Sequence, residues 1–534
     1  MIKYFKISSD NIISSYGGIG SIVETPEASI LVLPLEKWLY YKQEIKNKDI
    51  DTIKSLSIDD QRLLKKLKNK FPNLEFLIEV PTNDTTNSGY RVSNDKRLIT
   101  GEIFPKWMFC PRCKKFMVYD DWYDIHRKKH PNKDFDLFCP FCLDKKGENK
   151  ISKVRLEQVR FIQISKNGEI SDFPWEDWFL EKGHHLGKCE KHKLKYTTSP
   201  YSDNLESIRI SCENCEGWVS LTGIFDYSYQ DIMHTALRSS NSVYYPNIIR
   251  SLRIPIADSQ YEASDFKYSE LHYMINKAAG KREDEYDKID LKKLDYIGEG
   301  IYPISIRSLS MTSVLCSYNR LTPLSFNEIF NKDSSRHVTE AEINTRYLPA
   351  VESLGEGFLM VFAEDILKKW YDNSGLEYNM KEHLIKESSI IEGLSDSKYL
   401  LAKYSLLHTL SHILIKQMEY VCGYSAASIN ERIYVSDKGP SGIMIYTIAG
   451  AEGSYGGIVT MVESGKIKEI LKEAIEKAKY CTNDPVCYED TSFCFSCCLL
   501  PETSCECFNR LLDRSLVVDK KYGFINELSD ISKE

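Results

Sequence analysis

The segments Cys110-Pro-Arg-Cys113 and Cys139-Pro-Phe-Cys142 each hold two thiols three residues apart, and 25 residues separate the two segments. Two CxxC knuckles at this spacing can close one tetrahedral four-thiolate site, which is typical of structural zinc. A module this small buries too little apolar surface to fold unaided, so metal binding contributes directly to its folding free energy. The sequence therefore predicts a zinc ribbon with four ligands, namely Cys110, Cys113, Cys139 and Cys142.

A second pair of knuckles follows, Cys189-Glu-Lys-His192 and Cys212-Glu-Asn-Cys215, with 19 residues between them. One imidazole replaces one thiolate, which zinc accepts readily. We expect Cys189, His192, Cys212 and Cys215 to bind zinc, with His184 and His185 close enough in sequence to compete as ligands.

The third cluster crowds seven cysteines into 27 residues: Cys481, Cys487, Cys494, Cys497, Cys498, Cys505 and Cys507. Cys494-Phe-Ser-Cys497 is the evident knuckle, and Cys481 and Cys487 are the preferred second pair. Cys505 is the main competitor for a place in that pair. Thiolate ligands favour a soft, redox-silent tetrahedral ion, so up to three zinc ions are expected along the chain. An iron–sulfur cluster is the alternative for a four-thiolate site.

The bulk composition limits the class of protein. The chain has 534 residues, 42% of them hydrophobic, and a formal net charge of -7. This length predicts three or four domains, and this charge excludes a uniformly basic coat for nucleic acid. Met1-Ile-Lys-Tyr-Phe-Lys does not begin a signal peptide, and no apolar run reaches membrane-spanning length. We expect a cytoplasmic protein without membrane contact, in which a reducing environment favours metal binding over disulfides.

The expected fold class is α+β and multidomain. Four segments are predicted: an N-terminal α/β region (1–100), two zinc-ribbon-like modules (101–225), a mixed middle region (226–390) and a C-terminal α/β zinc-binding domain (391–534). Hydrophobic periodicity and punctuating residues predict helices over 35–45, 58–70, 398–422 and 466–480. They predict strands over 30–34, 432–435 and 443–448, and a loop over 82–97.

No catalytic motif is evident. Walker A, GxSxG and dinucleotide-binding patterns are all absent from the sequence. His408 and His412 stand at i and i+4 on one helix face, but their apolar surroundings favour buried, hydrogen-bonded structural histidines. The alternative is a cryptic nuclease or hydrolase that gathers His408, His412, Asp437 and Glu452 around the glycine-rich turn at 450–457.

Basic clusters flank the first predicted ribbon at Arg127-Lys128-Lys129-His130 and over residues 145–155. Such runs of basic residues usually form solvent-exposed faces. Their closeness to Trp107, Phe109, Phe138 and Phe141 is compatible with a surface for single-stranded nucleic acid.

Both ends of the chain contain recognisable sequence motifs. The C-terminal motifs are Leu407-His-Thr-Leu-Ser-His-Ile, Gly442-Ile-Met-Ile-Tyr-Thr, Glu452-Gly-Ser-Tyr-Gly-Gly and the run from Cys494 to Arg514. With the N-terminal Ile12-Ile-Ser-Ser-Tyr-Gly-Gly-Ile-Gly, they resemble the DrmB family of the DISARM anti-phage system. The C-terminal motifs also resemble the C-termini of MrfA-type helicases.

The resemblance implies a non-enzymatic accessory subunit of an antiviral defence system. Its partner would be a helicase subunit resembling DrmA, with DNA engaged through the complex. The resemblance also implies a four-cysteine zinc site in the C-terminal domain, which corresponds here to Cys481, Cys487, Cys494 and Cys497.

Overall fold

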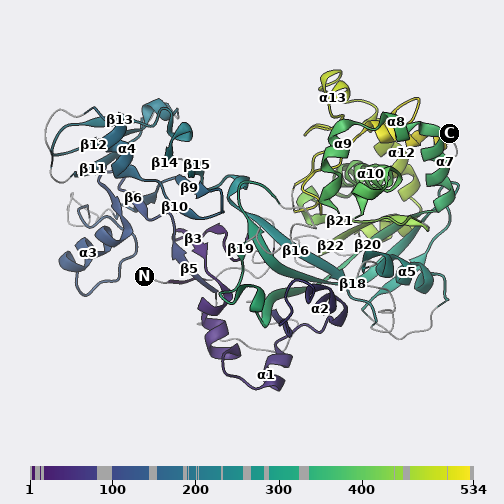
Figure 1. Ribbon diagram of the computed structural model, residues 1–534, viewed down its shortest axis with the longest axis horizontal. Coiled ribbons are helices and arrows are strands. Elements are labelled where there is room, and N and C mark those ends of the chain that lie inside the picture. Colours follow the sequence, from purple (N-terminus) through teal and green to yellow (C-terminus); the bar gives the residue numbers. More distant parts are fainter. Residues whose placement is uncertain are drawn as a thin grey trace.

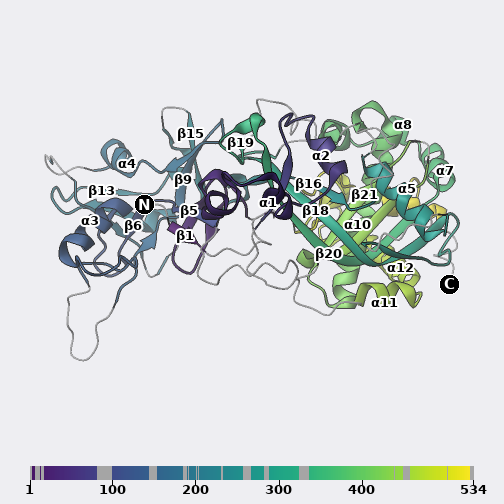
Figure 2. The same cartoon turned by 90° about the horizontal axis from the view of Figure 1, so that it is seen from below.

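The computed structural model describes most of the chain, with several short gaps. The described residues are 3–5, 13, 17–80, 99–142, 153–184, 189, 192–199, 201–202, 204–229, 232–255, 266–281, 288–323, 336–391, 393–437, 439–448, 457–501 and 503–528. The predicted loop over 82–97 lies outside them. The zinc-ribbon segment occupies one end of an elongated molecule and the C-terminal segment the other (Figures 1 and 2). Among the described residues, no helix is long and apolar enough to cross a membrane.

An eight-stranded sheet forms the centre of the larger end. Its main path is β16-β18-β20-β22-β21, while β17 and β19 also pair with β18, and β4 pairs with β20. The strands are β4 (Phe76–Glu79), β16 (Tyr245–Leu252), β17 (Asp290–Lys293), β18 (Ile301–Asn319), β19 (Arg336–His337), β20 (Tyr347–Phe362), β21 (Ile429–Tyr434) and β22 (Ser441–Ile448). Three of the four predicted segments thus contribute to one sheet. The middle segment, about which the sequence indicated least, supplies its long central strands.

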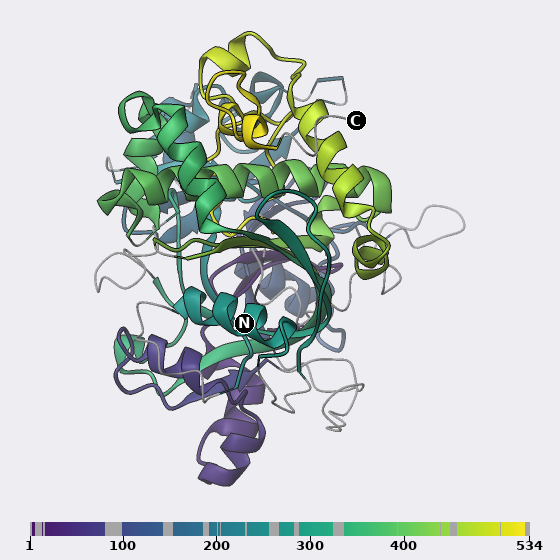
Figure 3. The same cartoon turned by 90° about the vertical axis from the view of Figure 1, so that its right-hand side faces the viewer.

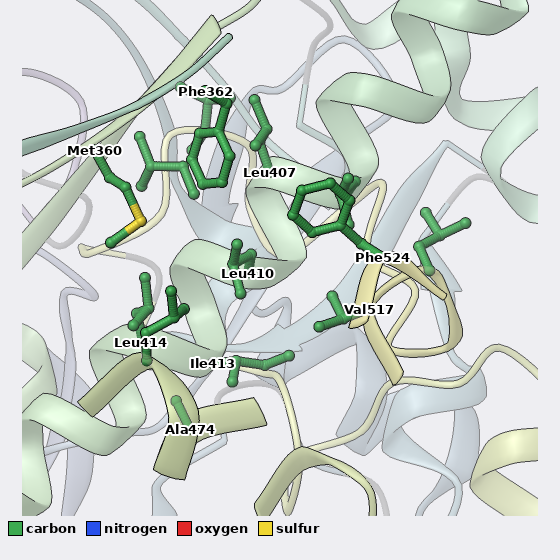
Figure 4. Close-up of a cluster of buried hydrophobic side chains, with 14 of the residues drawn as sticks. Met360, Phe362, Leu407, Leu410, Ile413, Leu414, Ala474, Val517 and Phe524 are labelled. Carbon is green, nitrogen blue, oxygen red and sulfur yellow. The ribbon is translucent and has the colours of Figure 1, made fainter. Parts of the chain in front are cut away.

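Helix α10 (Lys398–Cys422) covers one face of this sheet and is buried along most of its length. Ser397 begins it by accepting the Leu400 amide, and Gly423, at φ +70°, ends it. The predicted helix and its end are therefore confirmed. A helix that is apolar on all sides needs cover on all sides. Figure 3 shows the helix between the sheet and the C-terminal segment. Figure 4 shows side chains of that cover: Met360 and Phe362 from the sheet, and Ala474, Val517 and Phe524 from the C-terminal segment.

The opposite face of the sheet packs on α5 (Phe266–Ala278). Alternation along β20 sorts the two faces: Phe358, Met360 and Phe362 belong to the α10 core, whereas Leu359 and Val361 belong to the α5 core. Further helices complete the C-terminal end: α7 (Glu364–Ser374), α8 (Leu376–Asn379), α9 (Glu382–Glu387), α11 (Gly457–Glu463), α12 (Ile467–Ala478), α13 (Val486–Glu489) and α14 (Ser515–Val518). The predicted strands at 432–435 and 443–448 and the helix at 466–480 are confirmed as β21, β22 and α12.

A buried ion network fixes α5 to the sheet and to the N-terminal region. The Glu270 carboxylate in α5 is fully buried and accepts Arg62 Nη2 at 2.6 Å and Arg432 Nε at 2.7 Å. Arg432 also pairs with Glu506 at 2.7 Å. Burial would raise the pKa of Glu270, but the charges of Arg432 and Arg62 outweigh it and hold the pKa below its usual value.

The N-terminal region forms a second sheet in the order β1-β5-β3-β2, accompanied by two short helices. The elements are β1 (Lys3–Phe5), β2 (Ile22–Glu24), β3 (Ser29–Val32), β5 (Ile99–Ile103), α1 (Ile50–Ser55) and α2 (Gln61–Leu67). The continuous helix predicted over 35–45 is wrong: a 3-10 turn (Leu35–Lys37) and a π-helix (Tyr41–Ile45) replace it. Trp38 between them is extended and fully buried, and its indole donates to the Leu33 carbonyl at 2.8 Å, which interrupts the helix.

The ribbon end contains three small sheets, ordered β7-β6-β8, β11-β12-β13 and β10-β9-β15-β14. Its elements are β6 (Trp107–Phe109), β7 (Phe116–Val118), α3 (Tyr119–Lys129), β8 (Glu157–Gln158), β9 (Phe161–Ser165), β10 (Ile170–Asp172), α4 (Trp175–Lys182), β11 (Leu194–Thr197), β12 (Arg209–Cys212), β13 (Trp218–Ser220), β14 (Ser228–Tyr229) and β15 (Met233–Leu237). Phe109 stacks on Tyr196 at 4.5 Å, so the two ribbons share one apolar core.

Candidate metal centres

Centre I consists of Cys110, Cys113, Cys139 and Cys142, whose sulfurs lie within 4.8 Å of one another. The first knuckle follows β6, where the Lys114 amide donates to the Cys110 carbonyl at 2.8 Å. Lys114 has a φ of 63°, the left-handed conformation that turns the chain back into β7. The Cys113 amide points at Cys110 Sγ from 3.4 Å, as it would toward a thiolate.

The sulfur spacing in centre I fits a tetrahedral zinc ion. Zn–S bonds of about 2.3 Å at tetrahedral angles place sulfurs about 3.8 Å apart. The Cys110–Cys142 and Cys113–Cys139 sulfurs are 3.9 and 3.7 Å apart. These separations are far longer than an S–S bond, so the thiols are free and arranged as a ligand set.

Centre II consists of Cys189, His192, Cys212 and Cys215. Its knuckle at the end of β12 repeats the form of centre I: the Glu216 amide donates to the Cys212 carbonyl at 3.2 Å, and Glu216 has a φ of 54°. Cys189 Sγ lies 3.9 Å from Cys212 Sγ, and His192 Nδ1 lies 3.8 Å from Cys215 Sγ. The repeated backbone form, on unrelated sequence, indicates that both knuckles are shaped for the same task.

One of the two competing ligands proposed for centre II has another position. His184 exchanges two backbone hydrogen bonds with Trp218 and lies outside the ligand set. His185 lies outside the described residues.

Centre III consists of Cys481, Cys487, Cys494 and Cys497, with sulfur separations of 3.4 Å (Cys481–Cys494), 3.8 Å (Cys487–Cys497) and 3.7 Å (Cys494–Cys497). Cys505, the predicted competitor, lies elsewhere, beside His408 at 3.2 Å. A hydrogen bond from the Cys498 thiol is the leading cause that lowers the pKa of Cys497, to about 5. A sulfur with this pKa offers a thiolate to a metal at neutral pH.

Buried arginine anchors centre III to the helical core. The fully buried Arg514 donates to the Ala478 carbonyl at the end of α12 at 2.9 Å. It also pairs with Asp484, in the turn between Cys481 and Cys487, at 2.6 Å. The position of the first two ligands is thus fixed by the core and not only by the loop that carries them.

The described residues of the hydrolase hypothesis, His408, His412 and Asp437, do not form an open site. His408 and His412 are fully buried, as the sequence analysis predicted for structural histidines, whereas Asp437 is exposed. Glu452 lies outside the described residues. The group that does face the histidines is Glu431 of β21, which no local sequence spacing indicated, because it lies on a different element of the fold.

Four large apolar side chains are exposed on the segment that carries centre III and at the end of helix α10, which contacts that segment through Lys416. We call these four the apolar face: Tyr420, Tyr480, Val486 and Phe495. Their exposed fractions are 79%, 80%, 73% and 82%. Tyr480 and Val486 adjoin ligand cysteines, and Phe495 lies inside the last knuckle. Lys477 lies 4.2 Å from the Tyr420 ring and Lys416 5.7 Å from the Phe495 ring. Such a concentration of exposed apolar groups is typical of an interaction site.

Two lysines lie over aromatic rings beside centre I, and we call this set the cationic face: Lys129, Lys153, Phe138 and Phe141. Lys129 Nζ lies 4.4 Å from the Phe141 ring, and Lys153 Nζ lies 5.2 Å from the Phe138 ring. Both lysines are exposed, as are Arg127 and Lys128 in the last turn of α3.

Comparison with known proteins bears on centre III. A family model described as the MrfA Zn-binding domain matches residues 410–498, which include all of centre III. A domain of unknown function, DUF8724, matches residues 8–245. Among curated proteins, the chain is similar to the DISARM protein DrmB of Bacillus paralicheniformis, with 27% identity over 68% of this chain and 82% of the relative.

Among solved structures, the chain is similar to the DUF1998 helicase MrfA bound to DNA, at 10% identity and a TM-score of 0.24. The match covers 54% of this chain and only 25% of the helicase, so it carries no argument about shape. The resemblance to DrmB and to MrfA that the sequence motifs indicated is confirmed by the sequence comparisons.

Proposed function

We propose that this chain, a relative of the DISARM protein DrmB with an MrfA Zn-binding domain, is a non-enzymatic, zinc-binding accessory subunit of an anti-phage defence system. It docks on a helicase partner that resembles DrmA and helps that partner to engage DNA. The observation that carries the proposal is that three separate sets of thiolate-rich ligands are already arranged for metal binding. Each set lies beside an exposed surface or the core of a small module.

The burial of the histidines supports an accessory role over the hydrolase alternative. A general base must come within hydrogen-bond reach of its substrate. His408 and His412 are fully enclosed between α10, β21 and the segment after centre III, so a nucleic acid cannot reach either imidazole in this conformation.

The apolar face supports helicase docking. Aromatic side chains that are exposed in an isolated subunit gain most from burial against a partner, and such anchors dominate binding energies. Centre III and Arg514 hold the segments of the apolar face rigidly, so a partner would meet a preformed surface rather than a flexible loop.

The cationic face supports a direct contribution to DNA engagement. Single-stranded nucleic acid binds where cations follow the backbone and aromatic rings stack on bases. With a formal net charge of -7, the chain must confine such attraction to a local surface, and the exposed lysines beside centre I provide one.

One experiment tests both surfaces in the intact complex. The tagged chain is co-expressed with a helicase that resembles DrmA, and co-purification and binding of labelled single-stranded DNA are measured. Phe495→Ala with Tyr480→Ala should release the helicase at least tenfold more readily, whereas Tyr378→Ala, an equally exposed tyrosine on α8, should not. Zinc content should stay unchanged in both variants.

In the same complex, Lys129→Ala with Lys153→Ala should weaken DNA binding and flatten its dependence on log salt concentration by about 1.4, or about 0.7 for each lost contact to single-stranded DNA. Lys65→Ala with Lys68→Ala, which removes the same charge from the last turn of α2 and the residue after it, is the matched control. A chain that does not co-purify with the helicase would contradict the docking half of the proposal. Equal loss of DNA binding from both lysine pairs would contradict the half that concerns DNA.

A further inference from the structure

A fourth ligand group lies in the core, apart from centres I to III. His408 and His412 stand one turn apart on α10, Glu431 lies on β21, and Cys505 follows centre III along the chain. The ligand atoms of these four residues all lie within 4.8 Å of one another, and all four residues are buried. The 410–498 family match includes His412 and Glu431 but neither His408 nor Cys505, so it does not contain the whole group.

The hydrogen bonds of His412 leave its second ring nitrogen directed at the carboxylate. Nδ1 of His412 lies 2.8 Å from the Cys498 carbonyl oxygen, which can only accept, so Nδ1 carries a hydrogen. Nε2 then faces Glu431 Oε1 at 3.3 Å. A carbonyl partner on the far nitrogen is the usual device that orients a metal-binding imidazole.

Both imidazoles point at the same oxygen of the Glu431 carboxylate. Nε2 of His408 lies 2.9 Å from the same Glu431 Oε1, while the Ser411 hydroxyl donates to the other oxygen, Oε2. Two Nε2 atoms aimed at one oxygen need two protons between them in a fully enclosed site, or one cation that all of them share. A single divalent ion satisfies the three groups together.

Cys505 is held as the other ligand cysteines are. Its sulfur accepts the backbone amides of Cys507 and Asn509, both at 3.3 Å. Amides point in the same way at Cys110, Cys212 and Cys481 in centres I to III, at 3.4 Å each. Amide donors of this kind stabilise a thiolate rather than a neutral thiol. Cys505 therefore has the surroundings of a metal ligand without belonging to a CxxC knuckle.

The separations match a compact tetrahedral site. Zinc bonds of about 2.0–2.1 Å to nitrogen and oxygen and 2.3 Å to sulfur give N–O separations of about 3.4 Å and N–S separations of about 3.6 Å. The corresponding separations here are 2.9 and 3.3 Å for the two N–O pairs and 3.2 Å for His408 Nε2 and Cys505 Sγ. A shift of a few tenths of an ångström would admit the ion.

We propose that His408, His412, Glu431 and Cys505 bind a fourth structural zinc ion, which we call centre IV. Two imidazoles, one carboxylate and one thiolate suit zinc and exclude the hard cations calcium and magnesium. Four protein ligands with no opening to solvent make a closed site, which is structural and not catalytic. The ion joins α10, β21 and the segment after centre III into one rigid unit.

Metal content of the purified full-length chain, measured by inductively coupled plasma mass spectrometry after dialysis against zinc-free buffer, tests centre IV. Four zinc ions per chain are expected, falling to three in His412→Gln and in Cys505→Ala. Cys507→Ala removes a buried thiol two residues from Cys505 and should keep all four.

A core variant can fail to fold, so a second measurement uses the unaltered protein. Diffraction data collected on both sides of the zinc absorption edge should show an anomalous peak enclosed by the four side chains. No peak there, with peaks at centres I to III, would overturn the proposal and leave a hydrogen-bonded core network in its place. A metal content unaffected by a folded Cys505→Ala variant would overturn it equally.

Discussion

Replacing Glu270 by Ala removes the central anion of the buried ion network. Arg432, which is 2% exposed, then loses both contacts to the carboxylate, and Arg62 loses its 2.6 Å contact. Removing one partner of a buried ion pair typically costs about 3–5 kcal/mol, because the charge that remains in the core loses its partner. Arg432 keeps its 2.7 Å pair with Glu506, but Glu506 then faces the charge of Arg432 without the help of Glu270. This cost corresponds to a roughly hundred- to several-thousand-fold rise in the opening equilibrium of the surrounding structure.

Hydrogen exchange followed by mass spectrometry measures this opening directly, in peptides that cover α5 and β21. Glu270→Ala should accelerate exchange in both elements by the factor given above. Glu75→Ala is the matched control, because Glu75 pairs with Arg346 at 2.6 Å but both side chains are almost half exposed. Such a surface pair contributes about 0–1 kcal/mol.

A second substitution distinguishes the loss of the ion pair's attraction from the cost of leaving an arginine charge buried. Adding Arg432→Met to Glu270→Ala removes one of the two arginine charges that Glu270 neutralised, so the double variant should exchange more slowly than Glu270→Ala alone. Equal exchange in Glu270→Ala and Glu75→Ala, or a double variant worse than both single changes combined, would refute the reasoning.

The pH dependence of the same amides has a definite sign. The folded-state pKa of Glu270 is held below its usual value by Arg432 and Arg62, against the effect of burial. Its stabilising contribution is therefore complete above the unfolded-state pKa of about 4.3 and is lost as the pH falls through the lower folded-state value. Glu270→Gln should remove this part of the acid sensitivity.

Two further changes have local effects. Cys110→Ser leaves centre I with three ligands, so the purified chain should lose one zinc ion and the ribbon end should unfold at lower temperature, as followed by metal analysis and scanning calorimetry; Cys422→Ser, outside every cluster, should change neither. Ser397→Ala removes the oxygen that accepts the Leu400 amide at the start of α10 and should cost about 1 kcal/mol in denaturant unfolding, while Ser395→Ala, exposed two residues earlier, should cost less than half of that.

Local patterns in the sequence were sufficient for the elements and ligand groups that local physics determines. Helix α10 and its end at Gly423 follow from an apolar run and a left-handed glycine, and the knuckles of centres I to III follow from fixed spacing. The predicted helix at 35–45 failed because tertiary burial of Trp38 overrides helix propensity. The sheet formed by β4, β16, β18 and β20 was not predictable, since pairing partners lie far apart along the chain.

The same limit explains why the sequence analysis found half of the fourth ligand group. His408 and His412 share a helix face, so their spacing in the sequence indicates that they form a pair. Glu431 and Cys505 reach them only through the packing of β21 and the segment after centre III against α10. The sequence indicates Cys505 only as a competitor for centre III. It is one of seven closely spaced cysteines, and no local spacing separates it from the others.

The parallel pairing of β4 with β20 has a consequence for synthesis on the ribosome. Phe76 pairs with Tyr347, 271 residues later in the chain. The apolar core of the N-terminal region also includes Val314, Leu315 and Leu348 of the long strands. At about 5–20 residues per second, the emerging N-terminal region must wait on the order of 15–55 s for these strands. Throughout that interval Trp38, Leu63 and their neighbours lack their final cover, so nascent chains of this protein should depend on chaperones until β20 has left the exit tunnel.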